Sequence, residues 1–387
     1  MSPYHPATMT HKERVDRAFR HEPTDKVPIY QAGFSSAVAS FVLGREAYVG
    51  GGIQQYREAR ALWQGAAAHR EYLDRSFHDA CELCEMLDLD LVRTSYWRKP
   101  EKPAAHPDEH TFRYDDGSGG WEAWRLDPPT ETYMCVDRSP RPEPTEEDLW
   151  REAREAVEAA ERYTPTPECF PDQLRALQRF GGTHGIPGTG VGLCIPRERA
   201  WLEAVALCPE VVALYLDAQV MTAKKCAPVM VSMGLRHLFG GGDFASNTGP
   251  FYSPRSFHDL MLPRLQAISE ACSACGAQHF FASDGNLWPV ADDLFGASGV
   301  DGFYEVDRNF MSLRRLRERF PHLVLLGGIR SAVLHMGSEA DVLEETRTAL
   351  EDAREIGGCI VGCSNQVVAP TPERNVWTMM ETIDRYR

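Results

Sequence analysis

The stretch QHFFASDGNLWPVADDLFGASGVDGFYEVD, residues 278–307, decides the fold. Residues 278–285 and residues 300–307 each have the pattern of a short apolar strand that ends in polar residues, and a helical pattern lies between them. A strand, a helix and a second strand in this order are typical of a βαβ unit, in which the two strands run parallel. We therefore begin from a parallel pair of strands.

The same alternation extends along the chain in both directions from this stretch. Eight segments are predicted as strands, and they are residues 26–33, 90–97, 183–187, 235–244, 278–285, 300–307, 323–328 and 359–367. Eight strands that alternate with helices predict an α/β protein built as a (β/α)8 TIM barrel. An open, doubly wound sheet is the alternative. It is disfavoured because no G-x-G-x-x-G motif follows the first strand.

One region breaks the alternation. Residues 111–114 and 121–126 flank the sequence DDGSGG, which predicts a β-hairpin with a glycine turn. Proline-rich sequence then leads into a charged helix at about residues 146–162. We therefore expect a single domain over residues 1–387, with an inserted hairpin region at about residues 98–140.

The composition excludes several classes of protein. Apolar residues make up 43% and charged residues 25% of the chain, as in ordinary globular proteins. The net charge of −15 makes nucleic acid an unfavourable partner. Neither an apolar run long enough to span a membrane nor a secretory signal is present, so we expect a cytoplasmic protein with reduced cysteines.

Two C-x-x-C pairs, Cys81 with Cys84 and Cys272 with Cys275, resemble zinc or redox motifs. Each pair lies within an amphipathic helical pattern, and no second pair follows at the spacing of a zinc ribbon. We therefore predict that these four cysteines pack in the core without a bridge or a metal.

In a barrel of this type the functional residues lie at the carboxyl ends of the strands. This rule selects Asp243, Asp284 and Glu305 as catalytic candidates, because each stands at or near a predicted strand end. The alternatives are structural. Asp243 could cap the next helix, Asp284 could belong to a simple turn, and Glu305 could form a salt bridge with Arg308 or Arg330.

Other residues at the same strand ends are candidates for binding. We expect contacts to substrate from Arg330, Asn286, Tyr304 and Gln366. Cys363 could bind a metal with Glu305 and His279, and such a mixed set would suit zinc. A buried cysteine is more often a small apolar side chain, and His279 could be a core histidine with its hydrogen bonds satisfied.

Three sets of motifs resemble the uroporphyrinogen decarboxylase superfamily. They are THKERV at residues 10–15 with PTDKVP at 23–28, SDGNLWP at 283–289 with GVDG at 299–302, and GGI at 327–329 with GC at 362–363 and TPERNV at 371–376. The resemblance covers most of the chain except about residues 98–180, and it implies a (β/α)8 barrel.

Two activities are known in that superfamily. One branch decarboxylates the acetate side chains of a tetrapyrrole with an aspartate and arginines. The sequence YQAGF at residues 30–34 lacks both arginines of the corresponding motif, which argues against uroporphyrinogen as the substrate. The other branch moves methyl groups between corrinoid proteins and small molecules, and its thiol-methylating members bind zinc. Cys363 matches their cysteine on strand eight, but Ala282 and Asp284 stand at their other two ligand positions.

Three hypotheses follow from the residues and the resemblance together. The first is a methyltransferase-like enzyme that moves a methyl group from a small molecule to a corrinoid protein or another acceptor. The second is a cofactor-independent decarboxylase of a carboxylated substrate other than uroporphyrinogen. The third is a binding protein without catalytic activity.

Overall fold

The computed structural model describes residues 8–117 and 119–387, and the chain forms two compact units. Unit 1 comprises Met1–Tyr30, Glu143–Arg330 and Thr348–Ser364, and unit 2 comprises Gln31–Pro142, Ser331–Arg347 and Asn365–Arg387. The expectation that no secretory signal is present depends partly on residues 1–7, which lie outside the described residues.

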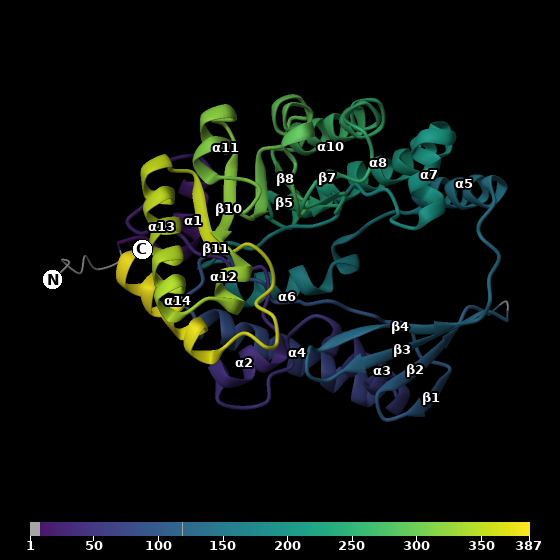
Figure 1. Ribbon diagram of the computed structural model, residues 1–387, viewed down its shortest axis with the longest axis horizontal. Helices are drawn as coiled ribbons and strands as arrows, with labels where there is room; N and C mark the ends of the chain where they lie inside the picture. Colours follow the sequence, from purple (N-terminus) through teal and green to yellow (C-terminus); the bar gives the residue numbers. More distant parts are fainter. Residues whose placement is uncertain (1–7, 118) are drawn as a thin grey trace. The chain divides into compact units, whose positions relative to one another are not determined.

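Unit 1 is built on a parallel sheet of five strands in the order β11-β10-β9-β8-β5 (Figure 1). The strands are β5 (His237–Gly241), β8 (Gln278–Ala282), β9 (Gly302–Val306), β10 (Val324–Ile329) and β11 (Cys359–Cys363). Four of them lie inside segments that the sequence predicts as strands, and β10 extends one residue beyond its predicted segment. The α/β class and the parallel arrangement are therefore confirmed.

Single bridges extend this sheet at both of its edges. Ile29 pairs in parallel with Val361 on β11, and Gly188 pairs in parallel with Leu238 on β5. These bridges fall within or next to the predicted strands 26–33 and 183–187, which do not form regular strands. Residues 90–97 do not form one either. The closed eight-stranded barrel remains a prediction.

The helices of unit 1 follow the predicted alternation, and Figure 1 shows α10 and α11 along one side of the parallel sheet. The helical segments are α1 (His11–Ala18), α5 (Glu146–Arg162), η1 (Pro167–Cys169), α6 (Pro171–Phe180), α7 (Arg199–Leu207), α8 (Pro209–Ser232), α9 (Pro254–Ser256), η2 (Phe257–Met261), α10 (Leu262–Ala274), η3 (Trp288–Val290), η4 (Asp292–Ala297) and α11 (Leu313–Arg319). A small ribbon of β6 (Ala245–Ser246) and β7 (Gly249–Pro250) follows β5. Helix α13 (Glu339–Ile356) has residues in both units.

The two faces of β8 show how the sheet is buried on both sides. His279 bonds to Ser269 on α10, whereas the ring of the next residue, Phe280, lies 4.9 Å from that of Phe19, the residue after α1. Successive side chains of a strand point to opposite faces. Both faces of β8 are therefore covered, as expected for a parallel sheet.

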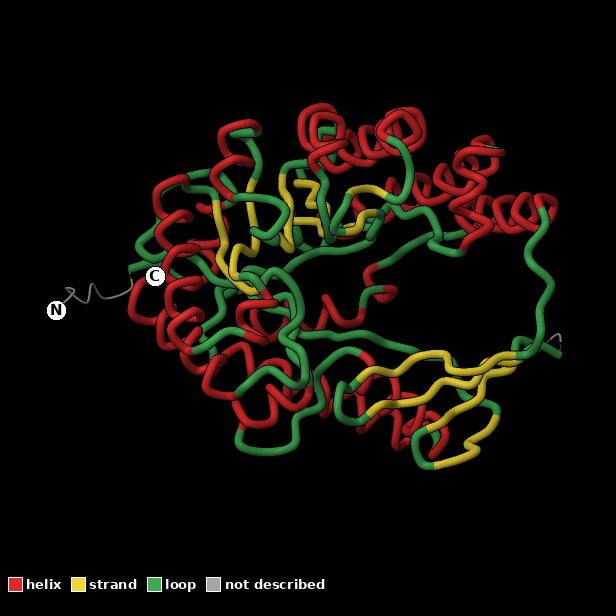
Figure 2. The backbone as a smooth tube through the Cα atoms, viewed as in Figure 1, coloured by secondary structure: helices red, strands yellow, loops and turns green. Residues whose placement is uncertain are grey.

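Unit 2 contains a four-stranded antiparallel sheet in the order β1-β2-β3-β4, drawn as one group of strands in Figure 2. The strands are β1 (Ala105–Asp108), β2 (Thr111–Asp115), β3 (Trp121–Asp127) and β4 (Thr132–Arg138). The predicted hairpin is the pair β2 and β3, with Thr111 opposite Arg125. Two further strands, β1 and β4, flank the hairpin, and both lie within the predicted insertion at about residues 98–140. Ser118 in its turn lies outside the described residues.

Helix α3 covers this antiparallel sheet. Tyr56 and Ala59 on α3 form one buried cluster with Phe112, Tyr114 and Tyr133 of the sheet. The other helices of unit 2 are α2 (Ser36–Leu43), α4 (Ala66–Met86), α12 (Ser331–Met336) and α14 (Glu373–Tyr386), and α3 itself is Gly52–Gln64.

The four cysteines of the two C-x-x-C pairs form no disulfide bond. Cys81, Cys84 and Cys272 are buried and Cys275 is half-buried. Burial raises the pKa of the Cys84 and Cys272 thiols to about 12. None of the described helices is by itself long and apolar enough to cross a membrane. Helices α7 and α8 reach the required length and apolar composition only when they are taken together, and the chain bends by 115° between them.

A candidate active site at the carboxyl ends of the parallel strands

Asp243 and Asp284 lie together at the carboxyl ends of two neighbouring strands. Gly241 on β5 is paired with Ala282 on β8, and both chains continue beyond this pair. The backbone amide of Asp284 donates to Oδ1 of Asp243 at 3.3 Å. The structure therefore brings these two catalytic candidates together, as the strand-end rule predicts.

The glycines before Asp243 have a different role from the one that their position suggests. The sequence alone is compatible with glycines that let a ligand approach the backbone. A Cβ atom at Gly240 would instead lie 2.3 Å from the carbonyl oxygen of Val191, and one at Gly242 would lie 2.4 Å from that of Leu193. These glycines let the backbone of residues 191–193 pack against β5, which fixes that segment beside Asp243.

Glu305 occupies a β-bulge near the end of β9. Its φ of +67° lies in the left-handed region, which few residues other than glycine adopt. The pairing of β9 with β10 shifts here, since Leu325 pairs with Phe303 but Gly327 pairs with Val306. Bulges often redirect a side chain next to an active site, and backbone strain of this kind is concentrated at functional sites. Glu305 thus has a local geometry that supports a functional role.

Gly327 makes this bulge possible. It has a φ of +123°, and a Cβ atom there would lie 2.7 Å from the backbone nitrogen of Val306. A residue with a side chain would force β10 away from β9. The GGI motif at residues 327–329 therefore supports the backbone that carries Glu305.

Arg308, one of the two arginines considered as partners of Glu305, forms an ion pair with α13. Nη1 of Arg308 lies 3.5 Å from Oδ2 of Asp352 on α13. Arg330 directly follows the last residue of β10, so it stands at the same end of the sheet as Glu305.

Tyr304, Asn286 and Gln366 have clear structural contacts. The ring of Tyr304 lies 4.7 Å from that of Phe239, so it extends an aromatic stack over β5 and β8. Oδ1 of Asn286 accepts from the backbone amide of Trp288 at 3.2 Å, which supports the turn before η3. Gln366 belongs to unit 2, where its side chain packs against Gly51. Their predicted roles in binding substrate remain proposals.

The residues proposed as zinc ligands do not form a metal site. His279 is fully buried in the first half of β8, and its Nδ1 lies 2.9 Å from Oγ of Ser269. Phe281 pairs with Phe303, Phe303 with Leu325, and Leu325 with Cys359, so Phe281 and Cys359 lie at the same level of the sheet. His279 comes two residues before this level and Cys363 four residues after it, which separates them by about six residues, or roughly 20 Å, along the strands. Within residues 8–117 and 119–387, no three His, Cys, Asp or Glu side chains are arranged to hold a metal ion. The set of Cys363, Glu305 and His279 does not fit zinc.

Sequence analysis did not identify a second group of residues beside Asp243. Nη1 of Arg197 lies 3.8 Å from Oδ2 of Asp243, whose side chain is 45% exposed. The Gln219 side chain accepts from the amide of Cys194 and donates to its carbonyl, both at 2.8 Å. Burial raises the pKa of the Cys194 thiol, which is therefore protonated at neutral pH. The strand-end rule does not identify these residues, because Cys194 and Arg197 lie seven and ten residues beyond the predicted strand 183–187 and Gln219 lies on α8.

Comparison with known proteins identifies the family. A family model described as Uroporphyrinogen decarboxylase (URO-D) matches residues 191–386, about half of the chain, and the chain belongs to this family. The matched residues include Asp243, Asp284, Glu305 and Cys363. The resemblance inferred from the sequence motifs is thus confirmed.

One solved structure supports the fold. A methyltransferase from Methanosarcina mazei is similar over 98% of this chain and 99% of its own, with a TM-score of 0.60 and 18% sequence identity. A provisionally assigned vitamin B12-independent methionine synthase from Listeria monocytogenes covers 94% of this chain and 98% of its own, with a TM-score of 0.47 and 16% identity. No curated protein sequence matches the chain.

Proposed function

We propose that this protein is a methyltransferase-like enzyme, which moves a methyl group from a small molecule to a corrinoid protein or another acceptor. The observation that carries the proposal is the acidic rim, defined as Asp243, Asp284 and Glu305 at the ends of β5, β8 and β9. An acidic rim repels a substrate with several carboxylates, such as a tetrapyrrole with acetate side chains. It accepts neutral or cationic methylated compounds, including ethers, thioethers and amines.

The chemistry of methyl transfer suits such a rim. When a methyl group leaves an ether oxygen, negative charge develops on that oxygen, and a positioned acid can supply a proton to it. We assign this role to a carboxyl group of the Asp243 and Asp284 pair. Glu305, held by the bulge, would orient the leaving group from the neighbouring strand.

We also propose that the parallel sheet belongs to an eight-stranded barrel. The bridges at Ile29 and Gly188 support this proposal, because they add a parallel segment at each edge of the five-stranded sheet. In such a barrel the ends of β5, β8 and β9 form one continuous rim, and substrate would bind at that mouth.

Decarboxylation is the second candidate, because two arginines stand at the same end of the sheet. Arg197 contacts Asp243, and Arg330 follows β10. An arginine can bind a substrate carboxylate through two parallel hydrogen bonds. A substrate with a single carboxylate is compatible with this arrangement.

The test is a direct comparison of the two products. Purified protein is incubated with cob(I)alamin, which stands in for a corrinoid protein, and with a panel of methyl ethers, methyl thioethers and methylamines, while methylcobalamin is followed by its absorbance. A parallel panel of aromatic and aliphatic carboxylic acids is assayed for carbon dioxide. Methylcobalamin formation above the protein-free rate supports methyl transfer, and carbon dioxide release without it would replace this function by the decarboxylase.

A further inference from the structure

A cavity of about 410 Å³ lies at the opposite end of the sheet from the acidic rim. Two of its lining residues, His237 and Gln278, are the first residues of β5 and β8. Asp243 lies six residues beyond His237, so the cavity and the rim are separated by roughly 20 Å along the strand. Its volume is within the range of small-molecule sites.

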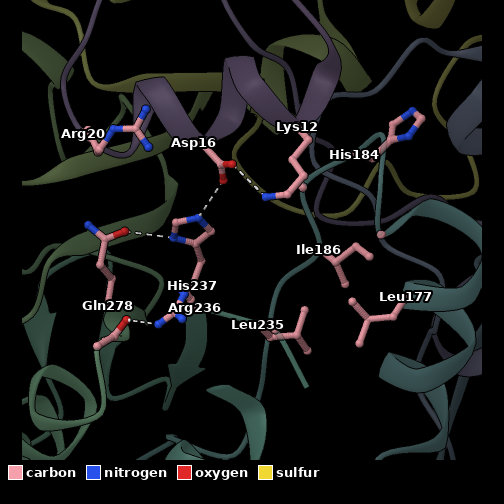
Figure 3. Close-up of a pocket in the computed structure, with 14 residues that line it drawn as sticks. Lys12, Asp16, Arg20, Leu177, His184, Ile186, Leu235, Arg236, His237 and Gln278 are labelled. Carbon is pink, nitrogen blue, oxygen red and sulfur yellow. Dashed lines mark hydrogen bonds and ion pairs between the residues drawn. The ribbon is translucent and has the colours of Figure 1, made fainter. Parts of the chain in front are cut away.

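The lining of this cavity carries an excess of positive charge. Lys12, Arg20 and Arg236 line it, and Asp16 is the one carboxylate among the lining residues that the structure describes (Figure 3). This excess is unusual in a chain whose net charge is −15. Glu22 pairs with Arg20 at 2.8 Å from outside the cavity, so Lys12 and Arg236 are the main source of the positive charge.

Lys12 and Arg236 keep hydrogen-bond donors that residues 8–117 and 119–387 do not use. Nζ of Lys12 donates to Oδ2 of Asp16 at 2.7 Å, which uses one of its three N–H bonds. Nη1 of Arg236 donates to the carbonyl of Gly276 at 3.0 Å, and no described carboxylate forms an ion pair with Arg236. An oxyanion could therefore bind to both side chains without displacing an internal ion pair.

His237 forms the polar floor of the cavity. Its Nδ1 lies 2.9 Å from Oε1 of Gln278, and its Nε2 lies 3.4 Å from Oδ1 of Asp16. Both partners are acceptors, because Nε2 of Gln278 donates to the carbonyl of Phe19. A neutral imidazole satisfies one of the two acceptors and an imidazolium satisfies both. Burial lowers the pKa of His237 despite the nearby Asp16, so the ring is neutral at pH 7 and Lys12 and Arg236 remain the source of the positive charge.

The remaining wall of the cavity is apolar. Leu177, Ile186 and Leu235 line it opposite the α1 side chains (Figure 3). We propose that this cavity is a second ligand site, which binds a small molecule through an oxyanion held by Lys12 and Arg236, with an apolar portion against the three aliphatic side chains. Because the amino-terminal end of such strands does not carry the chemistry in barrel enzymes, the ligand would regulate or stabilise the protein.

Titration calorimetry with two probes tests the proposal. Inorganic phosphate represents a phosphorylated ligand, and butyrate represents a carboxylate with an apolar tail. We expect saturable binding of at least one probe with one site per chain, and the stronger probe identifies the class of ligand. Absence of saturable binding of both probes would overturn the proposal.

Variants place the binding at this cavity. Arg236→Gln, on an exposed side chain, and Lys12→Met should each weaken binding at least fivefold. Arg255→Gln, which removes a cation from a side chain that is 92% exposed and does not line the cavity, should keep the affinity within twofold. Equal affinity in the wild type and in Arg236→Gln would contradict the site. Asp284→Asn should leave the affinity unchanged, so that failure here is distinguishable from failure of the proposed reaction.

Discussion

The backbone amide of Asp284 donates to the side chain of Asp243 across the ends of β8 and β5, at 3.3 Å. The backbone of Asp284 thus orients the carboxylate of Asp243. The side chain of Asp243 is 45% exposed, so the bond lies at the solvent-accessible edge of the sheet. The bond therefore holds Asp243 and Asp284 next to each other in the acidic rim.

Replacing Asp243 tests this bond through stability. Asp243→Ala removes the acceptor and should lower the unfolding free energy by about 1 kcal/mol, the usual value of one hydrogen bond. Asp243→Asn keeps an oxygen acceptor and should cost less. Urea unfolding measures both values, and equal costs for the two variants would show that the bond does not stabilise the rim.

The strained backbone of Glu305 gives a second prediction. Left-handed conformation in a residue other than glycine costs about 1–3 kcal/mol. Glu305→Gly should therefore unfold at the same temperature as the wild type or at a higher one, whereas Glu305→Ala gains no such relief. If Glu305 orients the leaving group, both variants should lose methyl transfer. Full activity in Glu305→Gly would assign the bulge to folding alone.

The two amino-terminal family motifs touch through a buried ion pair. Nε of Arg14, whose side chain is 1% exposed, donates to Oδ1 of Asp25 at 2.8 Å. Burial acts to raise the pKa of Asp25, but hydrogen bonds from Arg14 and from the amides of Thr8 and Met9 hold it well below its ordinary value. The motifs THKERV and PTDKVP thus form one structural clamp.

This clamp predicts an acid dependence of stability. Since the folded pKa of Asp25 is lowered, its contribution is present above about pH 4 and is lost as the pH falls further. Asp25→Asn should cost about 3 kcal/mol at pH 7, because it leaves the Arg14 charge buried without its partner. The cost should shrink at pH 3. Unfolding of both proteins at the two pH values measures it, and a cost independent of pH would contradict the ion pair.

His279 gives a second loss of stability in acid, at higher pH than that of Asp25. Full burial lowers its pKa from 6.5 to about 4, against a smaller opposing effect of a backbone hydrogen bond with Val191. The unfolded chain therefore binds a proton that the folded protein excludes, and stability falls as the pH drops from 6.5 towards 4. The difference corresponds to about 3 kcal/mol at 1.4 kcal/mol per tenfold. His279→Asn should remove this part of the pH profile, and an unchanged profile would place the proton elsewhere.

Sequence patterns predicted the order of the elements better than their limits. The apolar segments locate β5, β8, β9, β10 and β11, because a strand buried on both faces needs continuous apolar sequence. Because such a strand is apolar on both faces, its sequence does not show which face of the sheet each side chain lies on. In QHFFA, residues 278–282, apolar residues face both sides, so the pattern could not show that His279 points to Ser269 on α10.

The candidate site was predictable where it depends on strand order alone. Asp243 and Asp284 follow neighbouring strands, and parallel pairing brings their ends together. The bulge at Glu305 depends on the register between β9 and β10, which a single sequence does not encode locally. Arg197 and Cys194 reach the rim because glycines let residues 191–193 approach β5, a tertiary contact without a periodic signal.

The most direct measurement of the central claim is methyl transfer to cob(I)alamin in a matched pair of charge variants. Asp284→Asn removes a carboxylate of the acidic rim, and Asp259→Asn removes one from an exposed helical position. With the best donor of the panel, the account predicts that Asp284→Asn lowers the rate of methylcobalamin formation by about 100-fold or more, as expected for loss of a positioned acid. Asp259→Asn should retain the wild-type rate. Equal rates in the two variants would contradict a methyl transfer that depends on the rim.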